Sequence, residues 1–337
     1  MKVSIIIPAF NVERYIGRCL DSAINQTLDS SQYEIIIIND HSKDHTLNVV
    51  KKYYNKFTNL ILINNPKKLG PGISRNVGLK ISKGKYIFFL DSDDYIHKNT
   101  LKILYTKGVK HKADVVGYNF KKIINHNKHI LKCRIDINKI QEPRNKIIKN
   151  FLYGEMDGSV IFSFIKRDMI YKNNIKFKGG VHEDILFIFK VYFFSSKIIK
   201  YDKDLYFKKN RSSSITNNLS PERILDLLKA FKDVYKFLSK KNKNLAKKYF
   251  QFYIRGLVGC IGTFLIENLK YCKKNKQQRY KNYFIIYKSV KGDFKKVLFN
   301  EISFKDKITK IYLEEFKKIP NFIKASKNYE KKYRKLN

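Results

Sequence analysis

The chain has 337 residues, 43% of them hydrophobic and 14% aromatic, which argues against a disordered protein and allows two domains or one enlarged domain. Its 70 Lys and Arg outnumber 29 Asp and Glu, and the formal net charge of +41 suits nucleic acid, an anionic membrane surface or a phosphorylated substrate, although a lysine-rich genome composition would also give this charge. Four cysteines without a CxxC pair argue against a disulfide framework and a zinc ribbon.

The first apolar segment is interpreted as a strand and not as a signal peptide. Its run at residues 3–7 is short, lacks a small-residue cleavage site and is followed by Pro8. No segment offers the roughly 20 uncharged apolar residues that a membrane span needs. We therefore expect a cytoplasmic protein.

The first ninety residues alternate between predicted strands and predicted helices. The strands are residues 3–7, 33–38, 60–63 and 86–90. Apolar residues recur at helical spacing in three stretches: Ile16, Leu20, Ala23 and Ile24; then Leu47, Val50 and Tyr54 after a cap at Ser42 or Asp44; then Ile73, Val77 and Ile81 after Pro71. This order predicts an α/β fold with a parallel sheet and right-handed crossovers.

Beyond residue 95 the pattern is mixed. We expect a helix over 101–109, strands over 115–120 and 130–135, and a helix opened by Glu142 and Pro143. After Pro221 the chain reads as helical and basic, with 31 Lys and Arg against 10 Asp and Glu in residues 221–337.

Polar residues follow three of the predicted strands. They are Pro8-Ala9-Phe10-Asn11, Asn39-Asp40-His41-Ser42 and Asp91-Ser92-Asp93-Asp94. Because ligands bind outside the carboxyl ends of the strands in such sheets, these segments should meet at one ligand-binding rim.

Three carboxylates, Asp91, Asp93 and Asp94, occur within four residues of a chain that is poor in acids. A helix cap or a turn would explain them individually. Side by side they repel one another, by about 1 to 4 kcal/mol for each pair at ~4 Å, and a divalent cation removes that repulsion. Mg²⁺ or Mn²⁺ typically joins one or two carboxylates to substrate phosphates, so this segment is a candidate metal site.

Several ordered motifs in about the first 216 residues resemble the glycosyltransferase family 2 enzymes, which have a GT-A fold. The motifs are VSIIIPAFN at 3–11, IIINDHSKD at 36–44, LGPGISRNVGL at 69–79, YIFFLDSDDY at 86–95, VHEDILF at 181–187 and LYFKKNRSSSIT at 205–216. There is also a general likeness to bacterial enzymes that build lipooligosaccharide and capsule.

The resemblance implies a Rossmann-like, mostly parallel sheet that seats a UDP-sugar. Phe10 would lie against the uracil, with Pro8, Ala9 and Asn11 around it and Asp40 bonded to the ring. Arg75 would help to hold the nucleotide, and Ser92 lies in the same binding segment. Asp91 would face the ribose or the metal's water shell, Asp93 would coordinate Mn²⁺ or Mg²⁺, and Asp94 would mainly cap a following helix.

The acidic pair Glu183-Asp184 precedes an apolar stretch, so alone it reads best as the start of a helix. The resemblance makes Asp184 the general base and Glu183 a residue that orients it or contacts the acceptor. The configuration at the sugar would invert, and Arg211 would add positive charge near the leaving diphosphate. The role of His182 is open: it could contact the acceptor, support a catalytic residue, or be a solvated loop residue.

Two segments depart from the family pattern. Many relatives have a Trp and a Lys around residues 161–165, where this chain has no Trp and has Ser163 near the Lys position, so its acceptor recognition is expected to differ. Relatives commonly carry DDGS after the second strand, where this chain has Asn39-Asp40-His41-Ser42. Asp40, the acid that would face the uracil, is retained, but its loop is altered. The specificity for the nucleobase of the donor is therefore open.

Two parts are expected. Residues 1–218 would form the GT-A catalytic domain, with a nucleotide-sugar half at 1–100 and an acceptor half at 101–218. Residues 219–337 would be a mainly helical, basic region that is either solvated or attached to anionic lipid on the cytoplasmic face of the inner membrane. The acceptor would be a saccharide, lipid-linked in that case.

Three other functions agree with parts of the sequence. A nucleic-acid-binding protein fits the charge, but no helix-turn-helix, RRM-like or zinc pattern is present. An inactive sugar-binding protein fits the fold but not the retention of all the acids. A nucleotidyltransferase would need a glycine-rich loop after the first strand, which the sequence lacks.

Overall fold

The computed structural model describes residues 1–124, 127–131, 147–148, 150–151, 158–180, 182–209 and 221–247. By compactness the chain divides into two units, Met1–Ser212 and Ser213–Asn337. The roles assigned to a catalytic part and a basic part stay predictions.

A nine-stranded sheet in the order β3-β2-β1-β4-β8-β6-β9-β5, with β7 paired to β6, forms the first unit. The strands are β1 (Val3–Ala9), β2 (Tyr33–Asn39), β3 (Leu60–Asn64), β4 (Tyr86–Phe89), β5 (Tyr95–Ile96), β6 (Val115–Ile124), β7 (Asn127–Leu131), β8 (Ser163–Lys166) and β9 (Ile198–Lys209). β3, β2, β1 and β4 are parallel, as predicted. Every residue of β1, β2 and β4 is buried, which explains their near-continuous apolar sequences.

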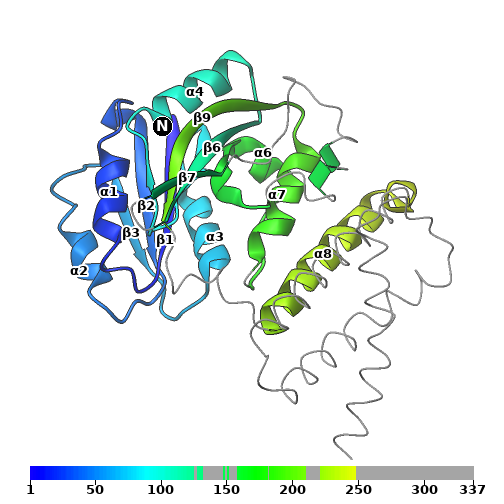
Figure 1. Ribbon diagram of the computed structural model, residues 1–337, viewed down its shortest axis with the longest axis horizontal. Helices are drawn as coiled ribbons and strands as arrows, with labels where there is room; N and C mark the ends of the chain where they lie inside the picture. The colour runs from blue at the N-terminus through cyan, green and yellow to red at the C-terminus, as the bar shows by residue number, and fades with distance from the viewer. Residues whose placement is uncertain are drawn as a thin grey trace, which may run out of the picture. The chain divides into compact units, whose positions relative to one another are not determined.

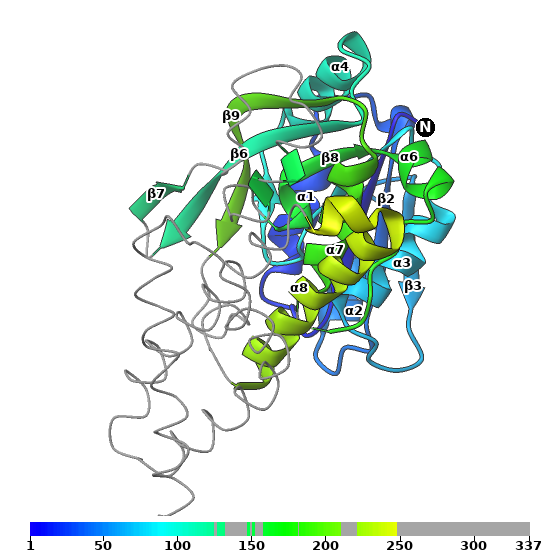
Figure 2. The same cartoon turned by 90° about the vertical axis from the view of Figure 1, so that its right-hand side faces the viewer.

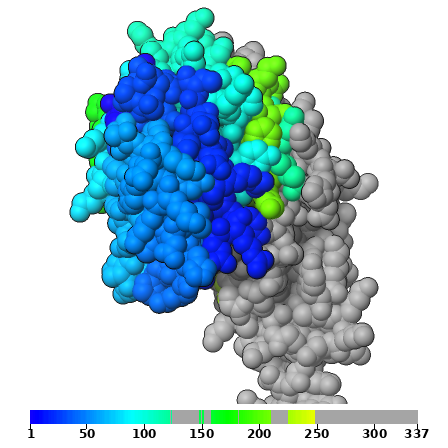
Figure 3. Space-filling model, turned by 90° about the vertical axis from the view of Figure 1, so that its left-hand side faces the viewer, coloured from blue at the N-terminus to red at the C-terminus, as the bar shows by residue number. Residues whose placement is uncertain are grey.

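Helices cover both faces of this sheet. They are α1 (Ile16–Ile24), α2 (Thr46–Lys51), α3 (Pro71–Ile81), α4 (Thr100–Lys110), α6 (Arg167–Lys172) and α7 (Glu183–Phe194). Figure 1 shows α1 and α2 on one side of the strands and α3, α6 and α7 on the other. On the face seen in Figure 3, the amino-terminal segments, drawn in shades of blue, make up much of the described surface.

The second half of the sheet brings late segments of the chain back beside the early ones. β8 runs antiparallel between β4 and β6, and β9 then pairs with β6 in parallel. Figure 2 shows β6 and β9 side by side. β9 also pairs with β5, so the end of β9 is carried next to the segment that follows β4.

Aromatic packing fixes α7 against the strand that leads into the acidic segment. The rings of Phe177 and Phe187 stack with centroids 3.8 Å apart, and Phe89 of β4 meets both edge-on at 5.5 and 5.9 Å. Such pairs contribute about 0.5–1.5 kcal/mol each beyond their burial. The start of α7 is thereby held near the end of β4.

The buried face of α3 differs from the predicted one. Ile73, Val77 and Ile81 are only half-buried, whereas Gly72, Ser74, Arg75, Gly78 and Leu79 are buried. A Cβ on Gly78 would lie 2.6 Å from Ile6 Cγ2, so α3 approaches the sheet too closely for any larger residue there. The apolar stripe was wrong because small residues, not branched ones, permit this approach.

The predicted stripe of α2 was also wrong at its last position. The helix ends at Lys51, and Tyr53 is buried while Tyr54 is 45% exposed. The N-cap is His45, so neither Ser42 nor Asp44 is the cap, although Asp44 Oδ1 accepts a hydrogen bond of 3.0 Å from Thr46 N at the start of the helix.

The later predicted elements are found where the structure describes them. The helix at 101–109 is α4 and the strand at 115–120 is the start of β6. The strand expected at 130–135 meets β7 only at its first residues, and its remainder lies outside the described residues. Glu142 and Pro143, which were expected to open a helix, also lie outside them, but residues 147, 148, 150 and 151 are described and helical.

Taken by itself, the described part of the second unit contains α8 (Pro221–Lys241), which begins at the predicted boundary and buries Leu228, Val234 and Leu238 at helical spacing. None of the helices in the described ranges has an apolar stretch long enough to span a bilayer.

Candidate active site

The loops after β1 and β2 are tied to each other. The backbone N of Asn11 donates to Ser42 Oγ at 3.0 Å, and Lys43 N donates to Asn11 Oδ1 at 2.8 Å. These reciprocal bonds bring two of the predicted rim segments together.

Two residues of these loops have left-handed backbone conformations, Asn11 with φ 48° and His41 with φ 63°. His41 occupies the position where the family's DDGS motif has glycine. Asn and His are among the side chains that best tolerate this region. The altered motif therefore keeps the turn that glycine would make.

Asp40 anchors the segment that leads into α3. Its Oδ1 accepts hydrogen bonds from Asn65 Nδ2 (2.8 Å) and Leu69 N (2.9 Å), and its Oδ2 accepts one from Gly70 N (2.8 Å). Burial opposes ionisation, but these hydrogen bonds outweigh it and lower the pKa of Asp40. The carboxylate is 3% exposed, so its described partners already use most of its acceptor capacity.

The other predicted nucleotide contacts lie at the end of β1. Pro8 and Ala9 are buried within the strand, and the carbonyl of Ala9 accepts a hydrogen bond from Asp40 N at 2.8 Å. Phe10 is half-buried beyond them, and Lys68 Nζ lies 3.9 Å from the centre of its ring. The ring is therefore the accessible part of this predicted subsite, with a cation beside it.

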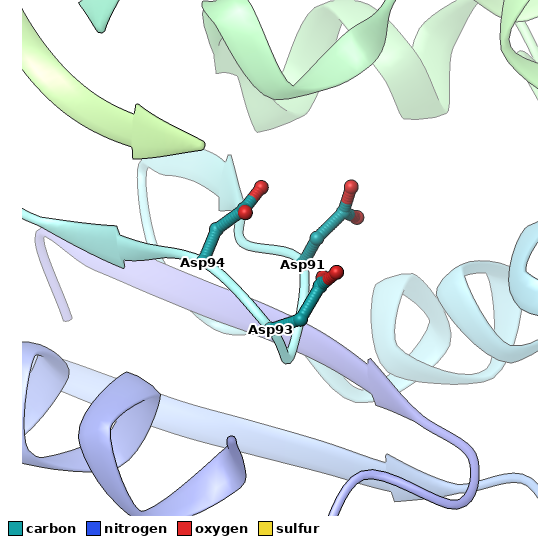
Figure 4. A group of neighbouring side chains, drawn as sticks. All are labelled: Asp91, Asp93 and Asp94. Atoms are coloured by element: carbon teal, nitrogen blue, oxygen red, sulfur yellow. The ribbon is translucent and has the colours of Figure 1, made fainter. Parts of the chain in front are cut away.

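The three carboxylates that follow β4 form one cluster. Ligand oxygens of Asp91, Asp93 and Asp94 lie within 4.8 Å of one another, and Figure 4 shows the carboxyl groups pointing to the same side of the loop. Asp91 and Asp93 are half-buried, Asp94 is buried, and Ser92 between them is buried as well.

Asp94 does not cap a helix, contrary to the prediction. The strand β5 follows it, and the next helix begins at Thr100. Its Oδ2 accepts a hydrogen bond of 2.8 Å from Tyr206 Oη, and its Oδ1 accepts one of 2.8 Å from Lys209 N. Burial, Asp93 and Asp91 raise the pKa of Asp94 well above its usual range. The carboxyl group joins the acidic loop to β9.

The chemistry of this cluster fits a hard divalent cation. All the ligand atoms are carboxylate oxygens, which Mg²⁺ and Mn²⁺ prefer, and two of the three acids reach the surface. Asp91 and Asp93 are the natural ligands, because both oxygens of Asp94 already accept hydrogen bonds within the protein.

Arg75 connects the acidic loop to α7. Its Nη2 lies 2.8 Å from Asp91 Oδ1, and its Nη1 lies 2.8 Å from Glu183 Oε1 and 3.1 Å from Asp184 Oδ1. Burial lowers the pKa of Arg75, but Asp184, Asp91 and Glu183 together raise it. The sequence motifs thus meet through one buried guanidinium.

Glu183 and Asp184 form the first turn of α7, as predicted. Asp184 Oδ2 accepts hydrogen bonds from Val160 N (3.2 Å) and Ser159 Oγ (3.3 Å). Burial raises the pKa of Asp184 against the opposing charge of Arg75, and burial together with Asp184 raises the pKa of Glu183 to about 7. A carboxylate with a raised pKa is a suitable proton acceptor.

The links that hold the acids in place were not predicted. Tyr206 and Lys209, which lie in the late motif, hold Asp94, and Asn65 holds Asp40, through hydrogen bonds across 25 to 115 residues, for which no periodic signal exists. Nothing in the sequence distinguished Lys68 from the many other lysines. His182 directly precedes α7 without capping it through its side chain. Arg211, which was expected to help the leaving group, lies outside the described residues.

Comparison with known proteins now identifies the family. The model of glycosyl transferase family 2 matches residues 4–173, half of the chain. The chain belongs to glycosyltransferase family 2. It is therefore a glycosyltransferase, and enzymes with this fold commonly use a divalent metal.

Two curated relatives are of similar length. The poly(ribitol-phosphate) β-N-acetylglucosaminyltransferase TarP of Staphylococcus aureus is 33% identical over 264 residues, which cover 74% of this chain and 78% of TarP. The cholesterol galactosyltransferase of Borreliella burgdorferi is 30% identical over 276 residues, 75% of this chain and 73% of the relative.

Solved structures of S. aureus TarS share the fold. The fragment 1–349 has a TM-score of 0.70 and 23% identity, with 98% of this chain and 92% of the fragment covered. The same fragment was also solved in complex with UDP-GlcNAc. The likeness confirms the predicted GT-A fold.

Proposed function

We propose that this protein is an inverting, metal-dependent glycosyltransferase that moves a sugar from a UDP-sugar to a hydroxyl group of a cell-surface glycan. One observation carries the proposal. A single guanidinium joins Asp91 of the acidic loop to Asp184 of α7, so a candidate metal ligand and a candidate base lie at one site. An inverting enzyme needs the metal beside the leaving diphosphate and the base beside the attacking hydroxyl, on opposite sides of one sugar carbon.

The donor would lie along the rim. Phe10 would stack on the uracil, Asp40 would accept a hydrogen bond from it, and Asn11 would border the ribose. The complex of TarS with UDP-GlcNAc supports a UDP-sugar. A divalent cation held by Asp93 and Asp91 would stabilise negative charge on the leaving diphosphate.

The base would be Asp184. The acceptor oxygen attacks the anomeric carbon and forms the new glycosidic bond, while the bond from that carbon to the diphosphate oxygen breaks and its electron pair leaves with UDP. The acceptor proton passes to Asp184. Attack opposite the leaving group inverts the configuration. Arg75, Ser159 and Val160 already orient the carboxylate, which supports this assignment.

The acceptor class comes from the relatives. Their names give poly(ribitol phosphate) for TarP and cholesterol for the B. burgdorferi enzyme, so related enzymes glycosylate both a surface polymer and a membrane lipid. We infer a surface acceptor such as teichoic acid, lipooligosaccharide, capsule or another lipid-linked saccharide for this chain.

A basic membrane-binding region would suit such an acceptor. Residues 221–337 carry 31 Lys and Arg against 10 Asp and Glu, with aromatic residues between them. We infer peripheral attachment to anionic lipid at the cytoplasmic face of the membrane. Sedimentation of the full chain with phosphatidylglycerol liposomes at low salt, and its release at high salt, tests this; no binding at low salt would refute it.

The first experiment is UDP release in Mn²⁺ across a panel of UDP-sugars. We expect slow hydrolysis of one donor, abolished by EDTA and by Asp93→Asn. Asp168→Asn is the control, because Asp168 is an exposed acid on α6, outside the site. Silence with every donor, together with no Mn²⁺-dependent UDP binding, would overturn the proposed function. Once a donor is found, stimulation of UDP release by poly(ribitol phosphate) or by a cholesterol-containing vesicle would identify the acceptor class.

A further inference from the structure

Arg75 stands at the centre of the acids but is almost closed to solvent. Its side chain is 5% exposed, and Nη1 and Nη2 between them contact Glu183, Asp184 and Asp91. Its Cζ lies over the Phe177 ring, 5.5 Å from the ring centre, and Nε has no hydrogen-bond partner among the described residues. All of its observed polar contacts are therefore with the protein's own carboxylates.

A purely structural ion pair would be built differently. Burying charged groups costs free energy, and their mutual attraction offsets this cost only when each group is fully paired. Here one guanidinium contacts three carboxyl groups, one of which, Glu183, has a pKa raised to about 7, and Nε has no hydrogen-bond partner in the described part of the chain. A cluster with this excess of negative charge points to a role in the reaction.

The neighbouring residue supplies a second connection. Asn76 Nδ2 donates to the carbonyl of Phe177 at 2.9 Å, and Phe177 N donates to Asn76 Oδ1 at 2.9 Å. Gly72, one turn earlier, lets the Glu183 side chain approach α3, since a Cβ there would lie 2.6 Å from Glu183 Cγ. One face of α3 thus fixes the segment that leads into α7, through Phe177, and the first turn of α7, through Glu183.

We propose that Arg75 is a positioning residue that sets Asp184 relative to the donor loop before any substrate binds. The guanidinium is planar and rigid, so Nη1 and Nη2 hold Asp184 and Asp91 at a fixed spacing. Asp184 is then placed to reach the acceptor hydroxyl that attacks the sugar carbon, by the same group that orients the metal ligand. This inference rests on the proposed function, and it replaces the expectation that Arg75 holds the nucleotide.

The test compares Arg75→Lys and Arg75→Ala with the wild type. A lysine ammonium cannot bridge three carboxylates as a fork does. We expect kcat for UDP-sugar hydrolysis or transfer to fall by about 10²-fold, the usual effect of a base misplaced by about 1 Å, while the dissociation constant of UDP in Mn²⁺ changes little. Millimolar guanidinium should partly restore kcat in Arg75→Ala, whereas sodium at the same ionic strength should not.

Arg167→Ala is the matched control. Arg167 also has a buried Nε without a partner among the described residues, but it pairs with Asp168 on α6. Its removal should leave kcat unchanged. Weaker UDP binding with unchanged kcat in Arg75→Lys would make Arg75 a nucleotide contact and overturn the inference.

A readout independent of turnover separates this inference from the proposed function. Hydrogen exchange in the peptide that contains Glu183 and Asp184 should quicken in Arg75→Ala and not in Arg167→Ala. If the wild type hydrolyses no nucleotide sugar, the proposed function fails, and faster exchange would still support the positioning role. Unchanged exchange with unchanged kcat would refute the positioning role alone.

Discussion

The hydroxyl group of Tyr206 donates a hydrogen bond of 2.8 Å to Asp94 Oδ2 and accepts one of 3.1 Å from the backbone N of Asp91. Tyr206 is fully buried in β9, more than a hundred residues beyond both aspartates. Burial, Asp94 and Asp91 raise its pKa well above the usual range, so it stays protonated and able to donate. One hydroxyl therefore fixes the loop that carries the candidate metal ligands.

Tyr206→Phe should loosen this loop. It leaves a buried carboxyl oxygen and a backbone N–H without their partner, which costs about 1–3 kcal/mol in the free energy of unfolding. We also expect weaker Mn²⁺-dependent binding of UDP, measured by calorimetry, because Asp91 and Asp93 lose their fixed spacing.

Tyr86→Phe is the control for that substitution. Tyr86 is equally buried, and its hydroxyl donates to the carbonyl of Ala113 at 2.8 Å, away from the acidic loop. It should lower the free energy of unfolding and leave UDP binding intact. Equal binding by both variants would show that Tyr206 is needed only for stability.

Gly72→Ala should lower the activity by displacing the first turn of α7. Its Cβ would lie 2.6 Å from Glu183 Cγ and 2.9 Å from the carbonyl of Lys178, distances that real Cβ atoms do not adopt. Gly17→Ala is the control, since the nearest atom to its Cβ would be Tyr53 Oη at an ordinary 3.4 Å. We expect kcat to fall in the first variant only. An unchanged kcat in Gly72→Ala would mean that α3 and α7 can move apart without loss of activity.

The parallel half of the fold was predictable because it depends on local signals. β1, β2 and β4 are near-continuous apolar runs, and Pro71 marks the start of α3. The buried face of α3 was not predictable in this way. Periodicity assigns burial to large apolar residues, whereas close packing selected Gly72 and Gly78, and ion pairing selected Arg75.

The candidate site likewise has a part that the sequence predicted and a part that it did not. Motifs indicated that Asp91, Asp93, Glu183 and Asp184 carry the chemistry, and the fold brings them to one place. What links them was not visible in the sequence: the bond between Arg75 and Glu183 spans 108 residues, and that between Tyr206 and Asp94 spans 112. Such bonds depend on the register of β9 and the approach of α3 to α7, which no local pattern encodes.

Phe10→Ala should weaken the binding of UDP by roughly 5- to 150-fold, because stacking of a base on an aromatic ring contributes about 1–3 kcal/mol. The ring is half-buried at the end of β1 with Lys68 beside it. Tyr54→Ala removes an exposed ring from the turn after α2 and should leave UDP binding unchanged. Fluorescence or calorimetric titration with UDP distinguishes the two variants, and equal affinities would place the uracil elsewhere.

Glu183 should make the stability of the protein depend on pH in an unusual direction. Burial and the adjacent Asp184 raise the pKa of Glu183 from 4.5 to about 7, so the folded state retains a proton that the unfolded chain has released. The free energy of unfolding should therefore be fully supported by this group below pH about 4.5, fall as the pH rises to about 7, and level off above. Glu183→Gln removes that proton and should flatten the fall, as measured by urea unfolding in EDTA between these pH values. An unchanged slope in Glu183→Gln would show that Glu183 is already ionised at low pH, with Arg75 outweighing its burial.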